Sequence, residues 1–328
     1  MTSRAGDRVA IVPGLASEQE VQTAVSFELA YVSVRAALGR MRGRRLERQA
    51  HPRLDLLGPS GSGLKMQPAV LDTEGGQIYG CQTYFVGEPR SAALRKVLVI
   101  ADGSTGSIVG VLASDFLSAV STAAVTAIAT EALLGTRPAS TAIVGTGKQA
   151  QMHARLLSAV FRPEKIDFVS REPSRGRAVA EEVGDLCPTP VGHVLEGADL
   201  RAYAAVVTAT RSRVPVLKAG QVSDSAVVCA IGAHALGRSE LDDTLLAATG
   251  TMVIDHAQQA DETYGELAAY RRLRPQRANA VKELSEVLER GPDAESRGLR
   301  VFKSGGTGFE TLAVGHAALQ SSGRPAAG

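Results

Sequence analysis

Hydrophobic residues recur at helical spacing in two long segments of the first half of the chain. In residues 17–42, apolar side chains repeat every three to four positions, and Ser17 with Glu20 has the spacing of a helix-capping pair. In residues 118–134 the repeat is rich in alanine and stops at Gly135. The pattern therefore predicts one long helix in each segment.

The segment 54–106, between these two helices, has short β-rich runs interrupted by glycine. Residues 97–101 form an apolar run, and a second apolar run follows at 108–112. Asp102-Gly103, between the two runs, is a turn signal. This part of the chain is therefore expected to form β-structure.

After Pro138 the pattern becomes an alternation of short apolar runs and amphipathic stretches. It predicts strands at 141–144, 166–170, 205–208, 226–231 and 252–255, and helices at 148–160, 174–183 and 241–248. Short, almost wholly apolar strands separated by helices are typical of a parallel sheet covered on both faces. The chain then runs through a strand at 299–303, a glycine-rich turn at 305–308 and a helix from Phe309. We therefore expect an α/β fold built on a doubly wound parallel sheet of the Rossmann type.

Composition narrows the class of protein. The 328 residues are 44% hydrophobic and carry a net charge of +2, which permits a sizeable core and gives no reason to expect a nucleic-acid or membrane partner. The basic cluster in residues 40–48 lacks interleaved aromatic residues, so we interpret it as a solvated helix end or a subunit contact. The three cysteines are widely spaced, which argues against a disulfide framework and a zinc site, and no metal is expected. The N-terminus lacks a signal-peptide pattern and no apolar stretch approaches a membrane span, so we expect a cytoplasmic protein.

A glycine-rich turn follows the first strand of the alternating series. Residues 142–150, Ala-Ile-Val-Gly-Thr-Gly-Lys-Gln-Ala, fit the G-x-G-x-x-G/A pattern of a dinucleotide site. Gly145 permits the tight turn, Gly147 lets the backbone approach a pyrophosphate at the helix N-terminus, and Ala150 allows close packing of the helix. A P-loop is excluded because Lys148 has no serine or threonine after it. The strand and helix on either side favour a dinucleotide site over a turn without a ligand.

The tip of the second strand bears on the choice of nicotinamide dinucleotide. NAD-binding folds place an acidic residue there for the ribose 2′-OH. This chain offers Ser170 and Arg171, with Arg175 close behind, and Glu172 is the only acidic competitor. Arginines suit the 2′-phosphate of NADP, so we favour NADP(H) and keep NAD(H) as the alternative. The other interpretation of the arginines is that they only cap the next helix.

Seven segments, in order, resemble the ornithine cyclodeaminase/mu-crystallin family over roughly residues 60 to 315. They are Gly63-Leu64-Lys65, 102–106, 121–124, 145–150, Thr208-Ala209-Thr210 with 215–217, Ile231-Gly232-Ala233 with Glu240-Leu241-Asp242, and 301–305. The resemblance implies a homodimer. It also implies a mixed α+β domain for substrate binding and dimerisation, residues 1–120 and 306–328, into which a Rossmann domain, residues 121–305, is inserted.

The resemblance and the turn together assign residues to a cofactor and to a small-molecule substrate lying between the domains. The cofactor residues are Thr122, Gly145, Thr146, Gly147, Lys148, Gln149, Ser170, Arg171, Arg175, Thr208, Ala209, Thr210, Ile231, Gly232 and Ser304. The substrate residues are Arg48, Lys65, Ser121, His234 and Gly305. The family also has an N-terminal arginine that contacts the substrate carboxylate. Arg45, Arg48 and Arg53 are all candidates for it, the spacing does not distinguish them, and Arg48 is our choice.

Two departures from the family pattern bear on the substrate. Ser121 stands where the family has the arginine of Arg-Thr-Ala-Ala, and a serine cannot replace a charged fork that grips a carboxylate. His234 stands where cyclodeaminases carry an aspartate that acts on the substrate amine. Ornithine cyclisation is therefore disfavoured, and we expect a ligand unlike ornithine. The missing arginine also argues against a ligand with the usual α-carboxylate.

These residues favour reduction of a C=N bond, which needs a hydride and a proton. Lys65, with a pKa lowered by the cationic nicotinamide or by desolvation, and His234 are the candidates for moving the proton. We therefore expect an NAD(P)H-dependent imine or ketimine reductase, or an amino-acid/imine dehydrogenase. Apart from the resemblance, Lys65 would be interpreted as an exposed loop lysine and His234 as a histidine bonding locally at a helix entry. Two other functions stay open: a non-catalytic cofactor- or ligand-binding protein, and an ornithine cyclodeaminase-like ammonia lyase using bound NAD.

Overall fold

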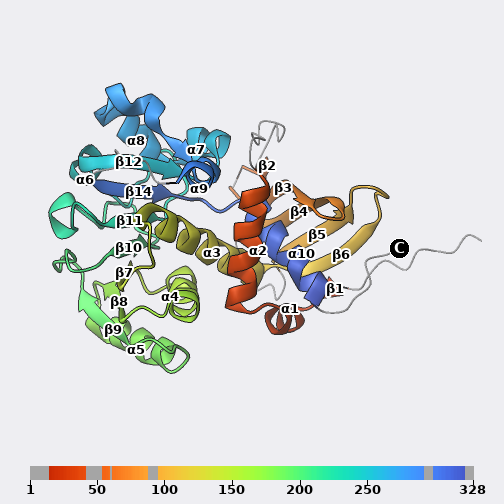
Figure 1. Cartoon of the computed structure of the whole chain (residues 1–328), viewed down its shortest axis with the longest axis horizontal. Helices are drawn as coiled ribbons and strands as arrows, with labels where there is room; N and C mark the ends of the chain where they lie inside the picture. The colour runs from red at the N-terminus through yellow and green to blue at the C-terminus, as the bar shows by residue number, and fades with distance from the viewer. Residues whose placement is uncertain (1–14, 42–53, 60, 88–94, 292–297, 322–328) are drawn as a thin grey trace, which may run out of the picture.

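The chain forms two sheets with helices between and around them (Figure 1). The computed structural model describes residues 15–41, 54–59, 61–87, 95–291 and 298–321. The first sheet, called sheet A, contains strands β1 to β6, and the second, called sheet B, contains β7 to β14. The α/β fold with a doubly wound parallel sheet, expected from the sequence, is confirmed.

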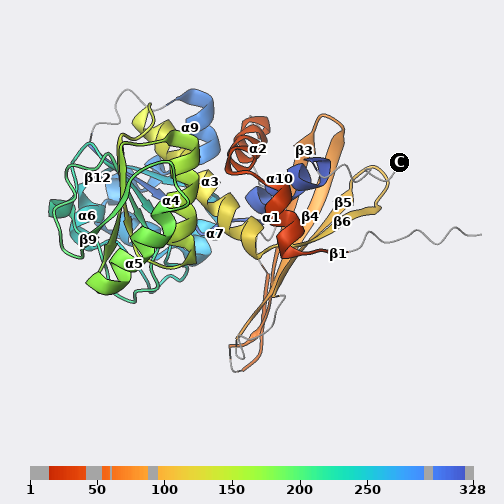
Figure 2. The ribbon, with the colours of Figure 1, turned by 90° about the horizontal axis from the view of Figure 1, so that it is seen from below.

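Sheet A has the strand order β1-β6-β5-β4-β3-β2 and is antiparallel except for the β1–β6 pair. Its strands are β1 (Leu15–Ala16), β2 (Leu54–Leu57), β3 (Gly63–Thr73), β4 (Gly76–Val86), β5 (Lys96–Asp102) and β6 (Ile108–Ala113). β3 and β4 form the long ribbon of Figure 2 rather than the short runs that the glycines indicated. Gly80 does not break β4, because it is a packing position: a Cβ there would lie 2.6 Å from a methyl carbon of Leu312.

Sheet B is parallel throughout, with the order β13-β12-β14-β11-β10-β7-β8-β9. Its strands are β7 (Ser140–Val144), β8 (Lys165–Ser170), β9 (Val191–Leu195), β10 (Ala205–Thr208), β11 (Val227–Ala230), β12 (Thr249–Ile254), β13 (Lys282–Glu283) and β14 (Leu299–Lys303). The six strands expected in this half are all present, and the sequence pattern missed only the edge strands β9 and β13. Because β7, β10 and β11 are neighbours paired in parallel, their carboxyl ends and the loops that follow meet at one edge of the sheet.

Helices cover both sheets and fill the space between them. They are α1 (Glu18–Ala24), α2 (Phe27–Arg40), α3 (Asp115–Leu134), α4 (Lys148–Phe161), α5 (Pro173–Gly184), α6 (Asp243–Ala248), α7 (Ala257–Thr263), α8 (Gly265–Leu273), α9 (Leu284–Arg290) and α10 (Gly308–Ser321). The single helix expected at 17–42 is wrong. The Ser17–Glu20 capping box is present, but the chain becomes extended at Val25 and restarts at Ser26, whose hydroxyl caps α2.

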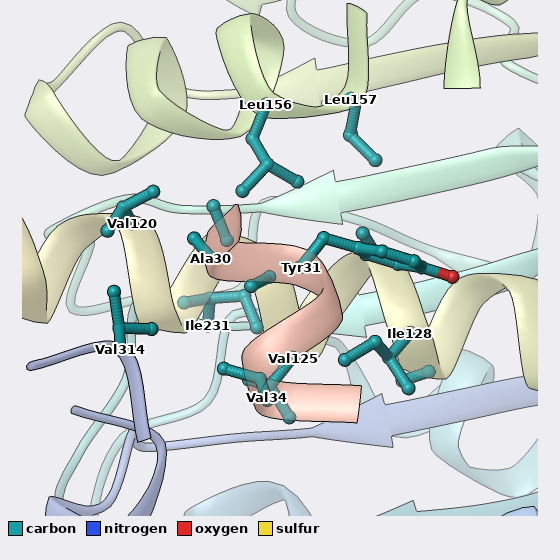
Figure 3. Packing of buried hydrophobic residues seen from close by; sticks show 14 of the residues in the cluster. Ala30, Tyr31, Val34, Val120, Val125, Ile128, Leu156, Leu157, Ile231 and Val314 are labelled. Carbon is teal, nitrogen blue, oxygen red and sulfur yellow. The ribbon is translucent and has the colours of Figure 1, made fainter. Parts of the chain in front are cut away.

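Helix α3 connects the two sheets and lies at the centre of the core. The sequence analysis expected no apolar stretch long enough to span a membrane, and this expectation is wrong. By length and composition alone, α3, with 20 residues, is long and apolar enough to do so. Most of α3 is buried in the protein, which explains its apolar character. Figure 3 shows Val125 and Ile128 of α3 beside Val34 of α2, with Leu156 of α4 nearby. The expected domain boundary at residues 120/121 falls inside this helix.

Candidate active site

A cleft of about 940 Å³ lies where the end of sheet A meets the carboxyl ends of the sheet B strands. Sheet A and α10 contribute Lys65, Gln67, Gln82, Tyr84, Val86, Arg95, Lys96 and Thr311. Helix α3, the loops after the sheet B strands and the first turns of α4 and α5 contribute Ser118, Thr122, Gly147, Lys148, Gln149, Arg175, Ala209, Thr210, Arg211, Ile231, Gly232, His234, Gly305, Gly306 and Thr307. The cleft therefore joins the glycine-rich turn to the face of sheet A that carries Lys65.

The glycine-rich turn has the geometry of a dinucleotide site. Gly145 has a φ of +119°, and a Cβ there would lie 2.6 Å from the carbonyl oxygen of Ala209, so a side chain is excluded by the protein itself. Gly147 is the N-cap of α4, and a Cβ there would meet no atom within 4 Å. Nothing in the protein requires a glycine at this position, whereas close approach of a diphosphate to the α4 N-terminus does. The side chain of Ala150 is fully buried, as the motif requires.

A buried carboxylate fixes the loops that follow β10 and β11. Glu240 is 0% exposed and lies between the two strand ends. Its Oε1 accepts hydrogen bonds from the backbone N–H and the hydroxyl of Thr210, at 2.7 and 2.6 Å. Its Oε2 accepts from the hydroxyl of Thr208 at 2.8 Å and from the N–H of Gly232 at 2.6 Å. Because Thr210 and Gly232 line the cleft, Glu240 shapes the wall on which a cofactor would lie.

A second buried carboxylate, Asp255, holds the glycine-rich turn after β14. Asp255 Oδ2 accepts hydrogen bonds from the Ser304 hydroxyl at 2.8 Å and from the Gly305 N–H at 3.0 Å, and the hydroxyl of Tyr264 donates to its Oδ1 at 2.7 Å. On the other side, Gln67 Nε2 of sheet A donates to the Gly306 carbonyl at 3.1 Å. This turn therefore fastens sheet B to sheet A at the floor of the cleft.

The face of sheet A in the cleft carries a cross-strand row of polar residues. Asp55, Lys65, Tyr84 and Lys96 are paired in register across β2, β3, β4 and β5, so their side chains lie on one face. Lys65 Nζ donates to Asp55 Oδ2 at 2.8 Å, and the Lys65 side chain is 16% exposed. Lys96 Nζ donates to the Ser118 hydroxyl at 3.2 Å and lies 5.3 Å from the centre of the Tyr84 ring. Lys65 is thus a fixed, ion-paired strand residue rather than an exposed loop lysine.

The structure brings most of the expected residues into this one cleft. Those that line it are Lys65, Thr122, Gly147, Lys148, Gln149, Arg175, Ala209, Thr210, Ile231, Gly232, His234 and Gly305. His234 is exposed, on the loop after β11 rather than at a helix entry. Arg48 lies outside the described residues, so its role stays a prediction.

Other expected residues lie outside the lining of the cleft, each for a local reason. The hydroxyls of Thr208 and Ser304 are buried and donate to Glu240 and Asp255, so these residues shape the site from behind. Gly145 and Thr146 form the turn itself, and the hydroxyl of Thr146 accepts a hydrogen bond from Arg175 Nε at 3.1 Å.

At the β8 tip and on α3, three more expected residues lie outside the lining. The hydroxyl of Ser170 donates to the Glu172 carbonyl at 2.9 Å. The Arg171 side chain is 85% exposed, and its Nε lies 3.8 Å from a carboxylate oxygen of Glu196. Ser121 is 1% exposed, and its hydroxyl lies 3.3 Å from that of Thr311.

The sequence argument missed several residues that line the cleft from sheet A. They are Gln67, Gln82, Tyr84, Val86, Arg95 and Lys96. Alternation along β3 and β4 puts Gln67, Gln82, Tyr84 and Val86 on the same face as Lys65, so this pattern was a signal for four of them. Lys96 is the first residue of β5, one position before the strand start expected from the sequence, and its pairing with Tyr84 depends on register.

Comparison with known proteins gives the family of this chain. The model of the ornithine cyclodeaminase/mu-crystallin family matches residues 14–318. The chain belongs to this family. It is 27% identical to the ketimine reductase mu-crystallin of Mus musculus over 254 residues, which cover 76% of this chain and 77% of that protein. It is 30% identical over 214 residues to the Delta(1)-pyrroline-2-carboxylate/Delta(1)-piperideine-2-carboxylate reductase of Azospirillum brasilense, covering 65% and 66% of the two chains.

Two solved structures have the same fold as this chain. The probable ornithine cyclodeaminase from Bordetella pertussis Tohama I is 25% identical and superposes with a TM-score of 0.78, over 95% of this chain and 99% of that one. The Delta(1)-pyrroline-2-carboxylate reductase of Thermococcus litoralis, in complex with NADH and L-proline, is 18% identical with a TM-score of 0.76, over 94% and 97% of the two chains. The resemblance noted in the sequence motifs is therefore confirmed over nearly the whole length.

Proposed function

We propose that this protein is an NAD(P)H-dependent oxidoreductase that reduces the C=N bond of a small metabolite. The observation that carries the proposal is the single cleft in which the open Gly147 turn faces Lys65 on sheet A. The names of the relatives support it, since they include a ketimine reductase and a reductase of Delta(1)-pyrroline-2-carboxylate. The residues present fit a dinucleotide, because the α4 N-terminus is bare and the surrounding loops are fixed by Glu240.

The roles of the residues follow from their places in the cleft. A bound nicotinamide would supply the hydride that reduces the C=N carbon. Lys65 Nζ donates to the Asp55 carboxylate at 2.8 Å, so its amino group is held at a fixed place in the cleft, from which it can donate a proton to the imine nitrogen. Protonation of the nitrogen makes the carbon a better hydride acceptor. We assign the proton to Lys65 before His234, because Lys65 is fixed on a strand whereas His234 is exposed on a loop.

We also propose NADP(H) as the preferred cofactor. Arg171 and Arg175 lie at or just after the tip of β8, and Arg175 lines the cleft beside Thr146. Glu172, the acidic residue of the tip, accepts a hydrogen bond from the Ser174 hydroxyl at 3.2 Å and lies outside the cleft lining. Two arginines next to a ribose would stabilise a 2′-phosphate and would gain nothing from a 2′-hydroxyl.

The direct test is turnover. Purified protein with NADPH or NADH is given a panel of cyclic imines and of keto acids with amines, and the loss of nicotinamide absorbance is followed. We expect turnover with at least one imine, a lower KM for NADPH than for NADH, and loss of turnover in Lys65→Met with NADPH binding retained. Tight NADPH binding without any turnover would favour the non-catalytic alternative, and ammonia release from ornithine without net change in nicotinamide would favour a cyclodeaminase.

A homodimer is proposed on the far face of sheet A. Leu56, Leu64 and Phe85 pair across β2, β3 and β4 and are 52, 43 and 42% exposed, so they form an apolar row on the face opposite Lys65. We propose that sheet A with α10 forms the substrate and dimerisation domain, and that residues 121–305 form the cofactor domain. Light scattering should give twice the chain mass of 34.2 kDa, and Phe85→Lys should lower it towards the monomer. A monomeric wild-type protein at micromolar concentration would refute the dimer. A cytoplasmic location stays a prediction.

A further inference from the structure

The described residues that line the cleft carry an excess of positive charge. Their cationic side chains are Lys65, Arg95, Lys96, Lys148, Arg175 and Arg211, and no aspartate or glutamate is among them. Three of these cations lie at the carboxyl edge of sheet B, on the side of the dinucleotide site: Lys148 and Arg175 in the first turns of α4 and α5, and Arg211 in the loop after β10. The remaining three come from sheet A, where the substrate would lie. The cleft therefore favours a ligand that is anionic on the sheet A side as well.

Two of the three sheet A cations already have close partners. Lys65 is paired with Asp55 at 2.8 Å. Arg95 donates from Nη2 to the carbonyls of Phe85 and Gly87, both at 3.2 Å, so its guanidinium is held at the strand end. Lys96 differs from both, because its nearest carboxylate oxygen, on the half-exposed Asp115, is 3.9 Å from Nζ.

Lys96 is a poorly compensated cation. Its side chain is 29% exposed, and burial lowers its pKa although Asp115 and Glu18 act in the opposite sense. The neighbouring charges of Arg95 and Lys148 lower the pKa further. A cation held in this way costs free energy in the empty protein, and an anion bound beside it removes that cost.

Lys96 also lies close to Ser121, the position at which this chain lacks the family arginine. Ser121 is buried against Thr311, and the residues of α3 that reach the cleft are Ser118 and Thr122, on either side of it. Lys96 comes from β5 and ends on the Ser118 hydroxyl at 3.2 Å, less than one turn of α3 before Ser121. A positive charge thus stands over the same stretch of the helix, supplied by a different element of the fold.

We propose that Lys96 binds a carboxylate of the substrate and replaces the arginine that this chain lacks at Ser121. The substrate class is then an imino acid, with its carboxylate on Lys96 and its imine nitrogen towards Lys65. This conclusion rests on the proposed reductase function. It revises the expectation, drawn from Ser121, that the ligand lacks the usual α-carboxylate. An ammonium is a compact charge rather than a planar fork, so Lys96 grips the carboxylate with less geometric selectivity than an arginine.

The test compares a substrate that has the carboxylate with one that lacks it. Wild type and Lys96→Gln are assayed with NADPH on Delta(1)-pyrroline-2-carboxylate and on 1-pyrroline. We expect Lys96→Gln to raise KM for the carboxylate substrate by about 10- to 100-fold, the effect of losing one charged hydrogen bond, and to leave the KM for 1-pyrroline unchanged. Lys96→Arg, which keeps the charge, should recover most of the loss.

Lys165→Gln is the matched control. Lys165 also begins a strand, lies 4.4 Å from the centre of a tyrosine ring and 3.6 Å from the Asp167 carboxylate, but it lies outside the cleft lining. It should leave both KM values unchanged. An equal rise of both KM values in Lys96→Gln, or an equal effect of Lys165→Gln, would overturn the inference while leaving the reductase function standing.

A binding experiment separates the inference from the activity. L-Proline and pyrrolidine, which differ by one carboxylate, are titrated into the protein saturated with NADP⁺. We expect proline to bind wild type and Lys165→Gln, and to bind Lys96→Gln at least about tenfold more weakly, with pyrrolidine weak throughout. Proline binding that depends on Lys96 in a protein without turnover would support the inference and reject the function. Proline binding that is absent in wild type or unchanged in Lys96→Gln would reject the inference.

Discussion

Replacement of Glu240 by glutamine tests whether one buried carboxylate organises the cofactor wall. The change keeps the size of the side chain and removes its charge. Each carboxylate oxygen accepts two hydrogen bonds, and each pair includes one backbone N–H: that of Thr210 at Oε1 and that of Gly232 at Oε2. A hydroxyl can rotate to accept from an amide, but a backbone N–H cannot. In either orientation, the glutamine NH₂ therefore faces a backbone N–H.

The magnitude follows from these contacts. Glu240 is 0% exposed, so water cannot replace the lost acceptor. One buried N–H without an acceptor costs about 1 to 3 kcal/mol, and the remaining bonds lose the charge that strengthens them. We expect Glu240→Gln to lower the free energy of unfolding by about 3 kcal/mol. Because Thr210 and Gly232 line the cleft, we also expect NADPH affinity to fall by at least about tenfold.

Asp242→Asn is the matched control for this experiment. Asp242 lies two residues along the same loop and caps α6, with Oδ1 accepting from the Leu245 N–H at 2.9 Å. Asparagine caps a helix about as well as aspartate, so this variant should change stability by only a few tenths of a kcal/mol. The measurements are urea unfolding at pH 7 and a fluorescence titration with NADPH. The reasoning is refuted if Glu240→Gln unfolds at the same urea midpoint as Asp242→Asn and binds NADPH as tightly as wild type.

Three further predictions concern the turn, the β8 tip and the pH dependence. Gly147→Ala should keep the wild-type melting temperature and weaken NADPH binding by about 100-fold. Gly145→Ala should destabilise the protein by about 2 kcal/mol, because the φ of Gly145 is +119° and a Cβ there would lie 2.6 Å from a carbonyl oxygen. Thermal unfolding with and without NADPH distinguishes the two variants. Arg171→Ala should raise the KM for NADPH by about tenfold and leave that for NADH unchanged, since only NADPH has a 2′-phosphate; an equal rise for both would count against NADP(H). Burial lowers the pKa of His153 to about 4, so acidification from pH 6.5 to 4 removes up to about 3 kcal/mol of stability. Burial and the charge of Asp255 raise the pKa of Glu310, so protonation of Glu310 adds stability as the pH falls. Glu310→Gln should therefore lose stability between pH 7 and 5 more steeply than wild type in urea unfolding, and an identical slope would contradict this account.

The sequence predicted those parts of the fold in which the signal is local. The central strands of sheet B are short, continuous apolar runs because both faces are buried, and such runs can be recognised without knowing their neighbours. The edge strand β9 was missed because its residues are mostly half-buried and include polar His193. The break at Ser26 was missed because apolar residues continue at helical spacing across it, and only the capping hydroxyl marks the new helix.

The same distinction applies to the site. The turn at Gly145 and Gly147 could be predicted, because its strand, turn and helix are consecutive and each glycine has its own local reason. The charge at Lys96 could not be predicted, because its place beside Tyr84 depends on the register of two strands and its place beside Ser118 depends on how α3 crosses the sheet. Comparison of single motif positions shows that the arginine is missing from α3, but it cannot show that a lysine from β5 stands over the same helix. When a family's binding residue is missing from its motif, the residue that replaces it is therefore better sought among the side chains close in space than among those close in the sequence.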